Sequence, residues 1–292
     1  MRGGFETLNG QAFYVRRWGD PALPRLLLLH GFPEFGGAWS DLAPMLEDRF
    51  HVIAPDQRGF GQSWAPSDVK DVRMHHLVAD MIELIGPGPA VVMGHDWGAA
   101  VAYGLAMTHP KSVSGLIIAN GVHPVPFQRA LVAGGAQTNA SQYIHYLRRE
   151  GSEDRLAENN YARLVQLFSA KMDLSWLTDH RLPEYQTEWA RPGRLRAMIN
   201  WYRASPLVVP APDTSAAMPD LPLERMHIKC PHLLIWGDKD TALLSEATEG
   251  LEEFAPNLTR IHLTELDHWL IHQDPEAVSR LILDWTKGLT GT

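Results

Sequence analysis

The sequence predicts an α/β protein in which helices cover both faces of a mostly parallel sheet, with a helical segment inserted in mid-chain. Short apolar runs alternate with helical patterns over most of the chain, which is typical of a parallel sheet covered by helices. The 292 residues are 45% hydrophobic and 21% charged, enough to bury the core of one large domain. Only the stretch between about residues 123 and 226 lacks a convincing strand pattern. It is therefore interpreted as an insertion.

Elements of the first half of the chain are bounded by glycine, proline and aspartate, which close strands and helices. Apolar runs predict strands over residues 12–18, 25–30 and 51–54, and a further strand near residues 5–8. Helical spacing of apolar residues predicts helices over residues 39–46 and 72–85. A strand over residues 89–93, a helix from about residue 99 and a strand over residues 115–119 follow.

The strand and helix pattern returns late in the chain, with strands over residues 232–236 and 260–263 and a closing helix over residues 276–285. The insertion carries Tyr, Trp, Arg and Leu residues at helical spacing and has a proline-rich exit. We therefore expect a first core part over residues 1–122, a helical cap over residues 123–225 and a second core part over residues 226–292. The two core parts together supply eight strands.

Charge and cysteine content exclude several classes of protein. The formal net charge is −8 and Lys and Arg form no cluster, so neither nucleic acid nor an anionic membrane is expected as a partner. The start of the chain lacks an apolar signal segment, and no apolar run is long enough to span a bilayer. Cys230 is the only cysteine, so no intrachain disulfide can form and a cytoplasmic location is expected.

The run from Gly94 to Gly98, Gly-His-Asp-Trp-Gly, lies between a predicted strand and a predicted helix. A strand, a tight turn and a helix are the setting of the G-x-S-x-G nucleophile motif, but here Asp96 stands in place of the serine. A carboxylate is already ionised at neutral pH, so it needs no base before it attacks. Asp96 is therefore the candidate nucleophile, and the alternative is an ordinary N-cap of the helix.

A carboxylate that attacks saturated carbon leaves an ester, which a histidine-activated water must hydrolyse. After a nucleophile turn of this kind, the acid and then the histidine follow along the chain. Asp240, just past the strand over residues 232–236, is the candidate acid, with Asp238 as its rival. His268, past the last predicted strand, is the candidate base. Asn120 follows another strand but cannot serve as an anion.

Hydrolysis of an ester also needs two N–H groups that hold the carbonyl oxygen as it becomes negative. The backbone N–H of Trp97, directly after the candidate nucleophile, is the first candidate. The second is the N–H of Phe32, in the His-Gly-Phe-Pro run that follows the strand over residues 25–30, because Pro33 has no N–H. Taken alone, that run would be interpreted as a plain turn.

Three motifs carry a family resemblance: His-Gly-Phe-Pro-Glu over residues 30–34, Asp-Gln-Arg-Gly-Phe-Gly-Gln-Ser over residues 56–63, and the run over residues 94–98. With them the sequence resembles the α/β-hydrolase superfamily and, within it, the soluble epoxide hydrolases and their haloalkane dehalogenase relatives. The resemblance covers nearly the whole chain and is strongest over residues 25–125. It implies the α/β-hydrolase fold, with a helical cap, and a cis peptide between Phe32 and Pro33.

The resemblance also nominates two proton donors. Epoxide opening generates an alkoxide, a strong base that a tyrosine hydroxyl can protonate, and epoxide hydrolases resemble one another in carrying two such tyrosines in the cap. Residues 143–151 are similar to the first cap motif, whose leading tyrosine is the acid, so Tyr143 is nominated rather than Tyr146. Residues 200–203 are similar to the second and nominate Tyr202. The alternative is that both tyrosines simply pack in the cap.

A haloalkane dehalogenase is the alternative enzyme, because a halide ion needs only N–H donors and Trp97 could supply its indole N–H. Dehalogenases usually add an asparagine after the first His-Gly, where this chain has Phe32, or a cap tryptophan. The cap tryptophans are Trp176, Trp189 and Trp201. Fluoroacetate dehalogenases are similar too, but they hold the substrate carboxylate with arginines where this chain has Trp97 and Ala100. Small carboxylate substrates are therefore not expected.

The sequence thus predicts an epoxide hydrolase that attacks with Asp96 and hydrolyses the resulting ester with His268 and Asp240. No cofactor is expected, and no metal, because the 14 histidines show no metal-ligand spacing. The expected partner is a small epoxide, and the chain is expected to be a monomer or a homodimer. Its binding residues are expected to be Phe32, Trp97, Tyr143, Tyr202 and Trp269. The alternative outside the enzymes is a ligand-binding receptor on the same fold, although a pure binder has no need of a partly desolvated carboxylate.

Overall fold

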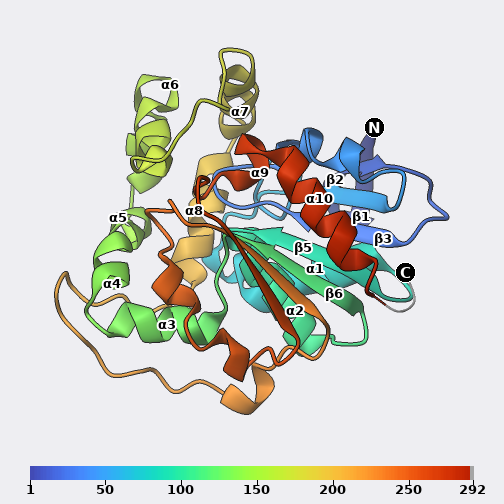
Figure 1. Cartoon of the computed structure of the whole chain (residues 1–292). Coiled ribbons are helices and arrows are strands. Elements are labelled where there is room, and N and C mark those ends of the chain that lie inside the picture. The colour runs from blue at the N-terminus through green and yellow to red at the C-terminus, as the bar shows by residue number, and fades with distance from the viewer. Residues whose placement is uncertain (290–292) are drawn as a thin grey trace.

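An eight-stranded sheet forms the centre of the computed structural model, which describes residues 1–289 (Figure 1). The strands are β1 (Arg2–Leu8), β2 (Gln11–Trp18), β3 (Arg25–Leu29), β4 (His51–Pro55), β5 (Ala90–His95), β6 (Val113–Ala119), β7 (His232–Gly237) and β8 (Leu258–Leu263). Their order is β1-β2-β4-β3-β5-β6-β7-β8. Only the β1–β2 and β2–β4 pairs are antiparallel. The predicted mostly parallel sheet of eight strands is confirmed.

Both faces of the sheet are apolar, because successive residues of a buried strand point to opposite sides. In β3, Leu26 and Leu28 join one buried cluster, whereas Leu27 and Leu29 join the other. The first cluster includes residues of α9 (Leu270–Gln273) and α10 (Pro275–Thr286), and the second includes residues of α1 (Met74–Ile85) and α2 (Trp97–Thr108). In Figure 1, α10 lies in front of the sheet in red. Helices therefore cover both faces, as predicted.

Between β6 and β7 the chain forms helices and, within its described residues, no strand. These helices are α3 (Pro124–Val132), α4 (Ala136–Ala140), α5 (Tyr143–Arg148), α6 (Ser152–Ser169), α7 (Arg181–Trp189) and α8 (Arg194–Ala204). Figure 1 shows this green-to-yellow group gathered at one side of the sheet. A stretch with only a short 3₁₀ helix, η4 (Leu223–Arg225), leads back to β7. The inserted segment is therefore helical, as its composition indicates.

The α-helix predicted over residues 39–46 is wrong in type. The chain there forms two 3₁₀ helices, η1 (Gly36–Ser40) and η2 (Ala43–Met45). Pro44 lies within the second and has no N–H to donate to an α-helical ladder. Trp39, a residue of the predicted helix, is nevertheless fully buried. The apolar spacing thus reports which side is buried but not which helix forms, because 3₁₀ and α-helical turns both return to one face after three residues.

The helix predicted over residues 72–85 begins two residues later, at Met74. Arg73 is extended, with φ −67° and ψ 148°, and separates α1 from the 3₁₀ helix η3 (Val69–Val72). Val72 is buried on the same side as the helix, so its apolar character extends the helical pattern beyond the helix. The difference matters for the site, because both Val72 and Met74 line a cavity described below.

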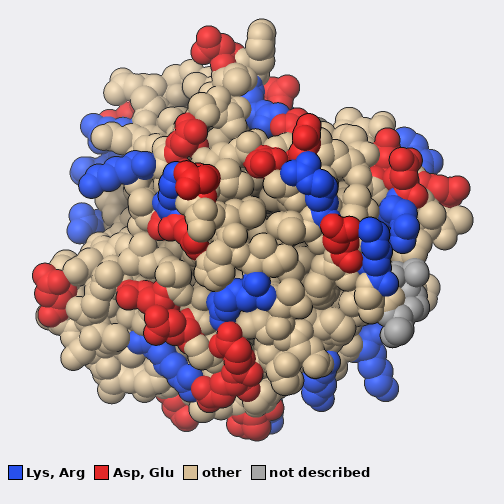
Figure 2. Space-filling model, in the orientation of Figure 1, with Lys and Arg blue, Asp and Glu red and all other residues tan. Residues whose placement is uncertain are grey.

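The surface in view mixes the two signs of charge. Figure 2 shows Lys and Arg interspersed with Asp and Glu, with no broad field of either sign on this face. None of the helices formed by residues 1–289 is long and apolar enough to cross a membrane. Within the same residues, His, Cys, Asp and Glu form no group of three or more that could hold a metal ion.

Candidate active site

Asp96 occupies the sharp turn between β5 and α2. Its backbone is strained, with φ 51° and ψ −121°, a conformation that non-glycine residues rarely adopt and that often marks a functional site. The turn is tight because Gly98 packs against β3, where any Cβ would overlap the carbonyl of Leu29. The side chain of Asp96 makes no capping hydrogen bond to α2. The N-cap alternative therefore lacks its defining interaction.

A backbone N–H holds one oxygen of the Asp96 carboxylate. The N–H of Phe32 donates to Asp96 Oδ1 at 2.7 Å, and the nearby backbone N–H of Trp97 helps to lower the pKa of the same carboxyl. Gly31 permits this approach, since a Cβ there would overlap the Asp96 side chain. The Phe32–Pro33 peptide is cis, as the resemblance implies. Of the two predicted oxyanion donors, Phe32 thus already contacts the carboxylate, and Trp97 lies near enough to affect its pKa.

His268 lies between the two carboxylates that the sequence nominates. Its Nε2 is 3.7 Å from Asp96 Oδ2, and its Nδ1 is 2.7 Å from Asp240 Oδ2. Asp238, the rival acid, instead lies 2.6 Å from Nδ1 of His262. Asp240 Oδ1 accepts hydrogen bonds from two backbone N–H groups at 2.8 and 2.9 Å, so the acid is fixed by the turn after β7. The structure therefore places the His268 ring between the carboxylates of Asp96 and Asp240.

Burial and neighbouring charges shift the pKa of Asp96, Asp240 and His268. Burial raises the pKa of Asp96 more than His268 and the backbone donors lower it. For Asp240, burial also acts upward, but the charge and hydrogen bond of His268 and the backbone donors outweigh it and hold the pKa below its usual value. Burial lowers the pKa of His268, yet Asp240, Asp96 and Glu34 together raise it to about 9. The raised pKa of His268 favours the imidazolium form in the free site at neutral pH.

Two tyrosine hydroxyls lie near Asp96 from the helical side. Tyr143 begins α5, Tyr202 lies near the end of α8, and their rings are 6.1 Å apart. The Trp97 ring packs edge-on against the Tyr202 ring, with the two ring centroids 5.0 Å apart. Burial raises the pKa of both tyrosines, and the charge of Asp96 adds to it. Both therefore stay protonated and can donate.

Arg148 holds the two tyrosine-bearing helices together. Its guanidinium donates to the backbone carbonyl oxygens of Tyr202, Ser205 and Leu207, each at 3.0 Å. Since Arg148 ends α5, it fixes the helix that begins with Tyr143 against the end of α8. Sequence reasoning assigns no role to Arg148, because a single arginine on a predicted helix surface gives no signal of three distant carbonyl partners.

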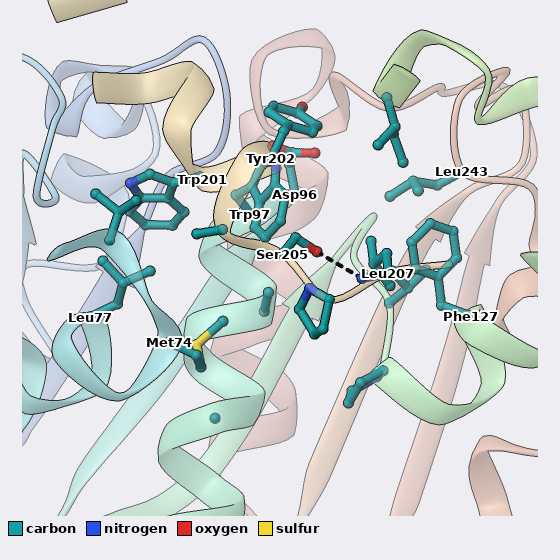
Figure 3. Close-up of a pocket in the computed structure, with 18 of the residues that line it drawn as sticks. Met74, Leu77, Asp96, Trp97, Phe127, Trp201, Tyr202, Ser205, Leu207 and Leu243 are labelled. Atoms are coloured by element: carbon teal, nitrogen blue, oxygen red, sulfur yellow. Dashed lines mark hydrogen bonds between the residues drawn. The ribbon is translucent and has the colours of Figure 1, made fainter. Parts of the chain in front are cut away.

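Two cavities meet at this group. The larger, about 300 Å³, is lined by Asp96, Trp97, Tyr143 and Tyr202 together with apolar residues of α1, α2 and α3 (Figure 3). The smaller, about 150 Å³, shares Asp96, Tyr143 and Tyr202 and is also lined by Phe32, His268 and Trp269. Every residue that the sequence nominates for the site, apart from Asp240, therefore borders one of the two cavities. Asp240 lies behind His268 and contacts it instead.

A buried carboxylate that sequence reasoning missed, Glu34, lies behind His268. His272 Nε2 is 2.6 Å from its Oε1, and Tyr185 donates to the same oxygen at 3.1 Å. His95 Nδ1 is 3.2 Å from Oε2, and His95 Nε2 is 2.8 Å from the carbonyl oxygen of His268. The chain of contacts from Glu34 through His95 therefore holds the backbone of the candidate base. The only local signal was the position of Glu34 directly after the His-Gly-Phe-Pro run.

Sequence reasoning rejects Asn120 as the acid but misses its contact with the candidate acid. It follows β6, and its Nδ2 donates to Asp240 Oδ2 at 2.8 Å while its Oδ1 accepts from Gly237 N at 2.6 Å. An amide cannot serve as the acid, but here it binds the acid. The signal that could have found it is register, because β5 and β6 pair with His95 opposite Ala119 and so bring Asn120 beside the nucleophile turn.

Comparison with known proteins identifies the class first. The family described as the alpha/beta hydrolase fold matches residues 24–275. The AB hydrolase superfamily protein YfhM of Bacillus subtilis is 33% identical over 288 residues, which are 97% of each chain. Epoxide hydrolase 4 of Homo sapiens is 30% identical, over 95% of this chain and 76% of that protein. The fold is thus that of an α/β hydrolase.

Similar solved structures indicate which family of α/β hydrolases the chain belongs to. An epoxide hydrolase from metagenomes of hot environments is 32% identical, with a TM-score of 0.89 over 99% of both chains. The epoxide hydrolase of Bacillus megaterium, solved with an inhibitor, is 27% identical, with a TM-score of 0.86 over 97% of this chain and 100% of that one. The chain therefore belongs to the epoxide hydrolase family of α/β-hydrolase enzymes.

Proposed function

We propose that the protein converts an epoxide into a vicinal diol through a covalent ester on Asp96. The observation that carries the proposal is that the two oxygens of the Asp96 carboxylate have different partners. Oδ1 is held by the Phe32 N–H, and Oδ2 faces His268 beside the cavities that Tyr143 and Tyr202 also line. One oxygen is thus anchored and the other is free to attack.

In the first step, Asp96 Oδ2 attacks one carbon of the epoxide and the bond from that carbon to the ring oxygen breaks. The ring oxygen takes the proton of Tyr143 or Tyr202, and the other hydroxyl donates a hydrogen bond to it. The elevated pKa of both tyrosines keeps the proton available until the alkoxide forms. The product of this step is a hydroxyalkyl ester of Asp96 and a tyrosinate.

In the second step, His268 Nε2 removes a proton from a water molecule that attacks the carbonyl carbon of the ester. The oxygen held by Phe32 and Trp97 carries the negative charge of the tetrahedral intermediate. When it collapses, the diol leaves with a proton and the carboxylate is restored. The proton that is released returns to the tyrosinate, so the sum is epoxide plus water giving diol. Loss of the Asp96 charge in the ester removes one of the influences that raise the pKa of His268, which favours the neutral base.

A haloalkane dehalogenase would share the nucleophile but needs N–H donors for the halide. The Trp97 ring already packs against the Tyr202 ring, and Phe32 stands where an asparagine would serve. These contacts favour the epoxide over the haloalkane. Diol formation from styrene oxide without bromide release from a bromoalkane would agree with the proposal, and the reverse result would replace it by dehalogenation. Membership of an enzyme family also favours catalysis over the receptor alternative.

The test is to trap the ester in a His268→Gln variant. After exposure to styrene oxide, mass spectrometry of the peptide that contains Asp96 is expected to show the added mass of the epoxide. The matched control is His262→Gln, which changes an exposed histidine on β8 and is expected to form diol at the wild-type rate with no lasting adduct. Absence of an adduct on Asp96 in the His268 variant would mean that the covalent route is wrong.

We also propose that residues 123–225 act as the cap, between core parts over residues 1–122 and 226–292. The position of α3 to α8 between β6 and β7, and their supply of both tyrosines, support this division. The cytoplasmic location and the monomeric or homodimeric state stay predictions from the sequence.

A further inference from the structure

The larger cavity runs along one face of α2. Trp97, Ala100, Gly104 and Met107 all line it, and their spacing of three, four and three residues keeps them on one side of the helix. At 1.5 Å per residue, the distance from the first to the last is about 15 Å. In Figure 3, Asp96 and Trp97 lie above and Met74 lies lower down. The cavity is therefore elongated, and the nucleophile lies at one end.

Small side chains on α2 leave room for this elongated shape. Ala100 is half-buried and faces the cavity. At Gly104, a Cβ would lie 3.0 Å from Val78 Cγ2 and 3.2 Å from Met74 Sδ. Any larger residue there would therefore press α1 away or fill the channel between the two helices. Met74, which also lines the cavity, is 37% exposed at the start of α1.

The chemistry of the lining changes along this length. Near Asp96 the polar groups are Tyr143 and Tyr202, whereas the middle and far parts are lined by aliphatic, methionine and aromatic side chains. Ser205 is the only other side chain with a hydroxyl, and its Oγ already accepts from the Leu207 N–H at 3.4 Å. Within the described residues, Asp96 is the only acidic or basic side chain of this lining. A charged group would find no partner in the far part.

Resting on the proposed function, we propose that the substrate is an uncharged epoxide with a long apolar chain on one ring carbon, and that this chain lies along α2. Ala100 and Gly104 would then determine which chains fit. The smaller cavity, beside His268, would take whatever short substituent the other carbon bears. Each buried methylene contributes about 0.8 kcal/mol, or roughly a fourfold gain in kcat/KM.

The test is a series of terminal epoxyalkanes from epoxybutane to epoxydecane with the wild type, Ala100→Leu and Ala100→Val. For the wild type, kcat/KM is expected to rise with chain length. Ala100→Leu is expected to lower kcat/KM at least about tenfold more for epoxydecane than for epoxybutane, mainly through KM. Ala100→Val should fall between. The matched control is Thr108→Leu, which adds the same side chain at an exposed position of α2 and is expected to change neither substrate.

A wild-type series that is flat, or an Ala100→Leu loss that is equal for short and long chains, would overturn the inference. If no epoxide gives a diol at all, the proposed function fails, and binding then tests the cavity separately. Calorimetric titration with alkane-1,2-diols is expected to show affinity that rises with chain length in the wild type and is lost in Ala100→Leu. Affinity that does not depend on chain length would again overturn the inference.

Discussion

Replacing Asp240 by asparagine changes one atom of the site and leaves its shape. The carboxylate of Asp240 accepts four hydrogen bonds: Oδ1 from the N–H groups of Ala242 and Leu243, and Oδ2 from His268 and Asn120. An asparagine can accept at only one end. If its oxygen keeps the two backbone donors, its NH₂ group faces the other two partners.

Neither of these partners can adapt without cost. Asn120 cannot rotate its amide, because its Oδ1 accepts from Gly237 N at 2.6 Å and its Nδ2 also lies 3.2 Å from the Gly237 oxygen. His268 can accept at Nδ1 only by moving its proton to Nε2, which then cannot take a proton from water. At about 1 to 3 kcal/mol for each of the two buried groups that lose their partner, Asp240→Asn is expected to lower the free energy of unfolding by about 2 to 6 kcal/mol.

The same change is expected to separate the two chemical steps. Ester formation needs Asp96 and the tyrosines, which Asp240 does not contact, so it should proceed. Ester hydrolysis is expected to slow by about 10⁴-fold, the effect of holding a triad histidine in the wrong tautomer. Intact-protein mass spectrometry should therefore show the ester accumulating, and urea unfolding should show the lower stability.

Asp238→Asn is the control for this experiment, because Asp238 pairs with His262 outside the site. It is expected to turn over epoxide at the wild-type rate with no accumulated ester. The reasoning would be refuted if Asp240→Asn formed diol within about tenfold of the wild-type rate. It would equally be refuted if Asp238→Asn were the variant that accumulated ester.

Two further predictions concern the protons. Tyr143→Phe and Tyr202→Phe are each expected to slow ester formation by about 10²- to 10³-fold, and the double variant to abolish it, as stopped-flow tryptophan fluorescence would measure; an unchanged rate would remove the tyrosines from the mechanism. Hydrolysis of the isolated ester is expected to become faster as pH rises, because only neutral His268 is a base. Its midpoint should lie below 9, the pKa in the free enzyme, since the ester removes the charge of Asp96; a rate that falls with rising pH would contradict this.

The sequence could predict that three of the nominated residues lie close together. Asp96, Asp240 and His268 each follow a strand, and the parallel sheet brings those strand ends together. A recognisable order along the chain was therefore enough to nominate them. Asp240 was separable from Asp238 only by its distance from the strand, and the turn after β7 directs the two side chains to different histidines.

Contacts between distant segments lay beyond the sequence. Glu34 and His272 are 238 residues apart, and no local pattern around either one indicates the other. The cavity shape was equally hidden, because it depends on how closely α1 approaches Gly104. Residues 39–46 show the same limit on a smaller scale, where apolar spacing alone could not separate two 3₁₀ helices from one α-helix.

The hydrogen bond from Phe32 to Oδ1 gives the two oxygens of Asp96 different fates. In the proposed reaction, Oδ2 departs with the diol and an oxygen from water takes its place, whereas Oδ1 remains for the lifetime of the enzyme. In water labelled with a heavy oxygen isotope, the first diol would carry no labelled oxygen. Each later diol would carry one labelled oxygen. After any number of cycles Asp96 would hold one labelled oxygen, because the hydrogen bond to Oδ1 prevents the carboxylate from rotating and exchanging its two oxygens.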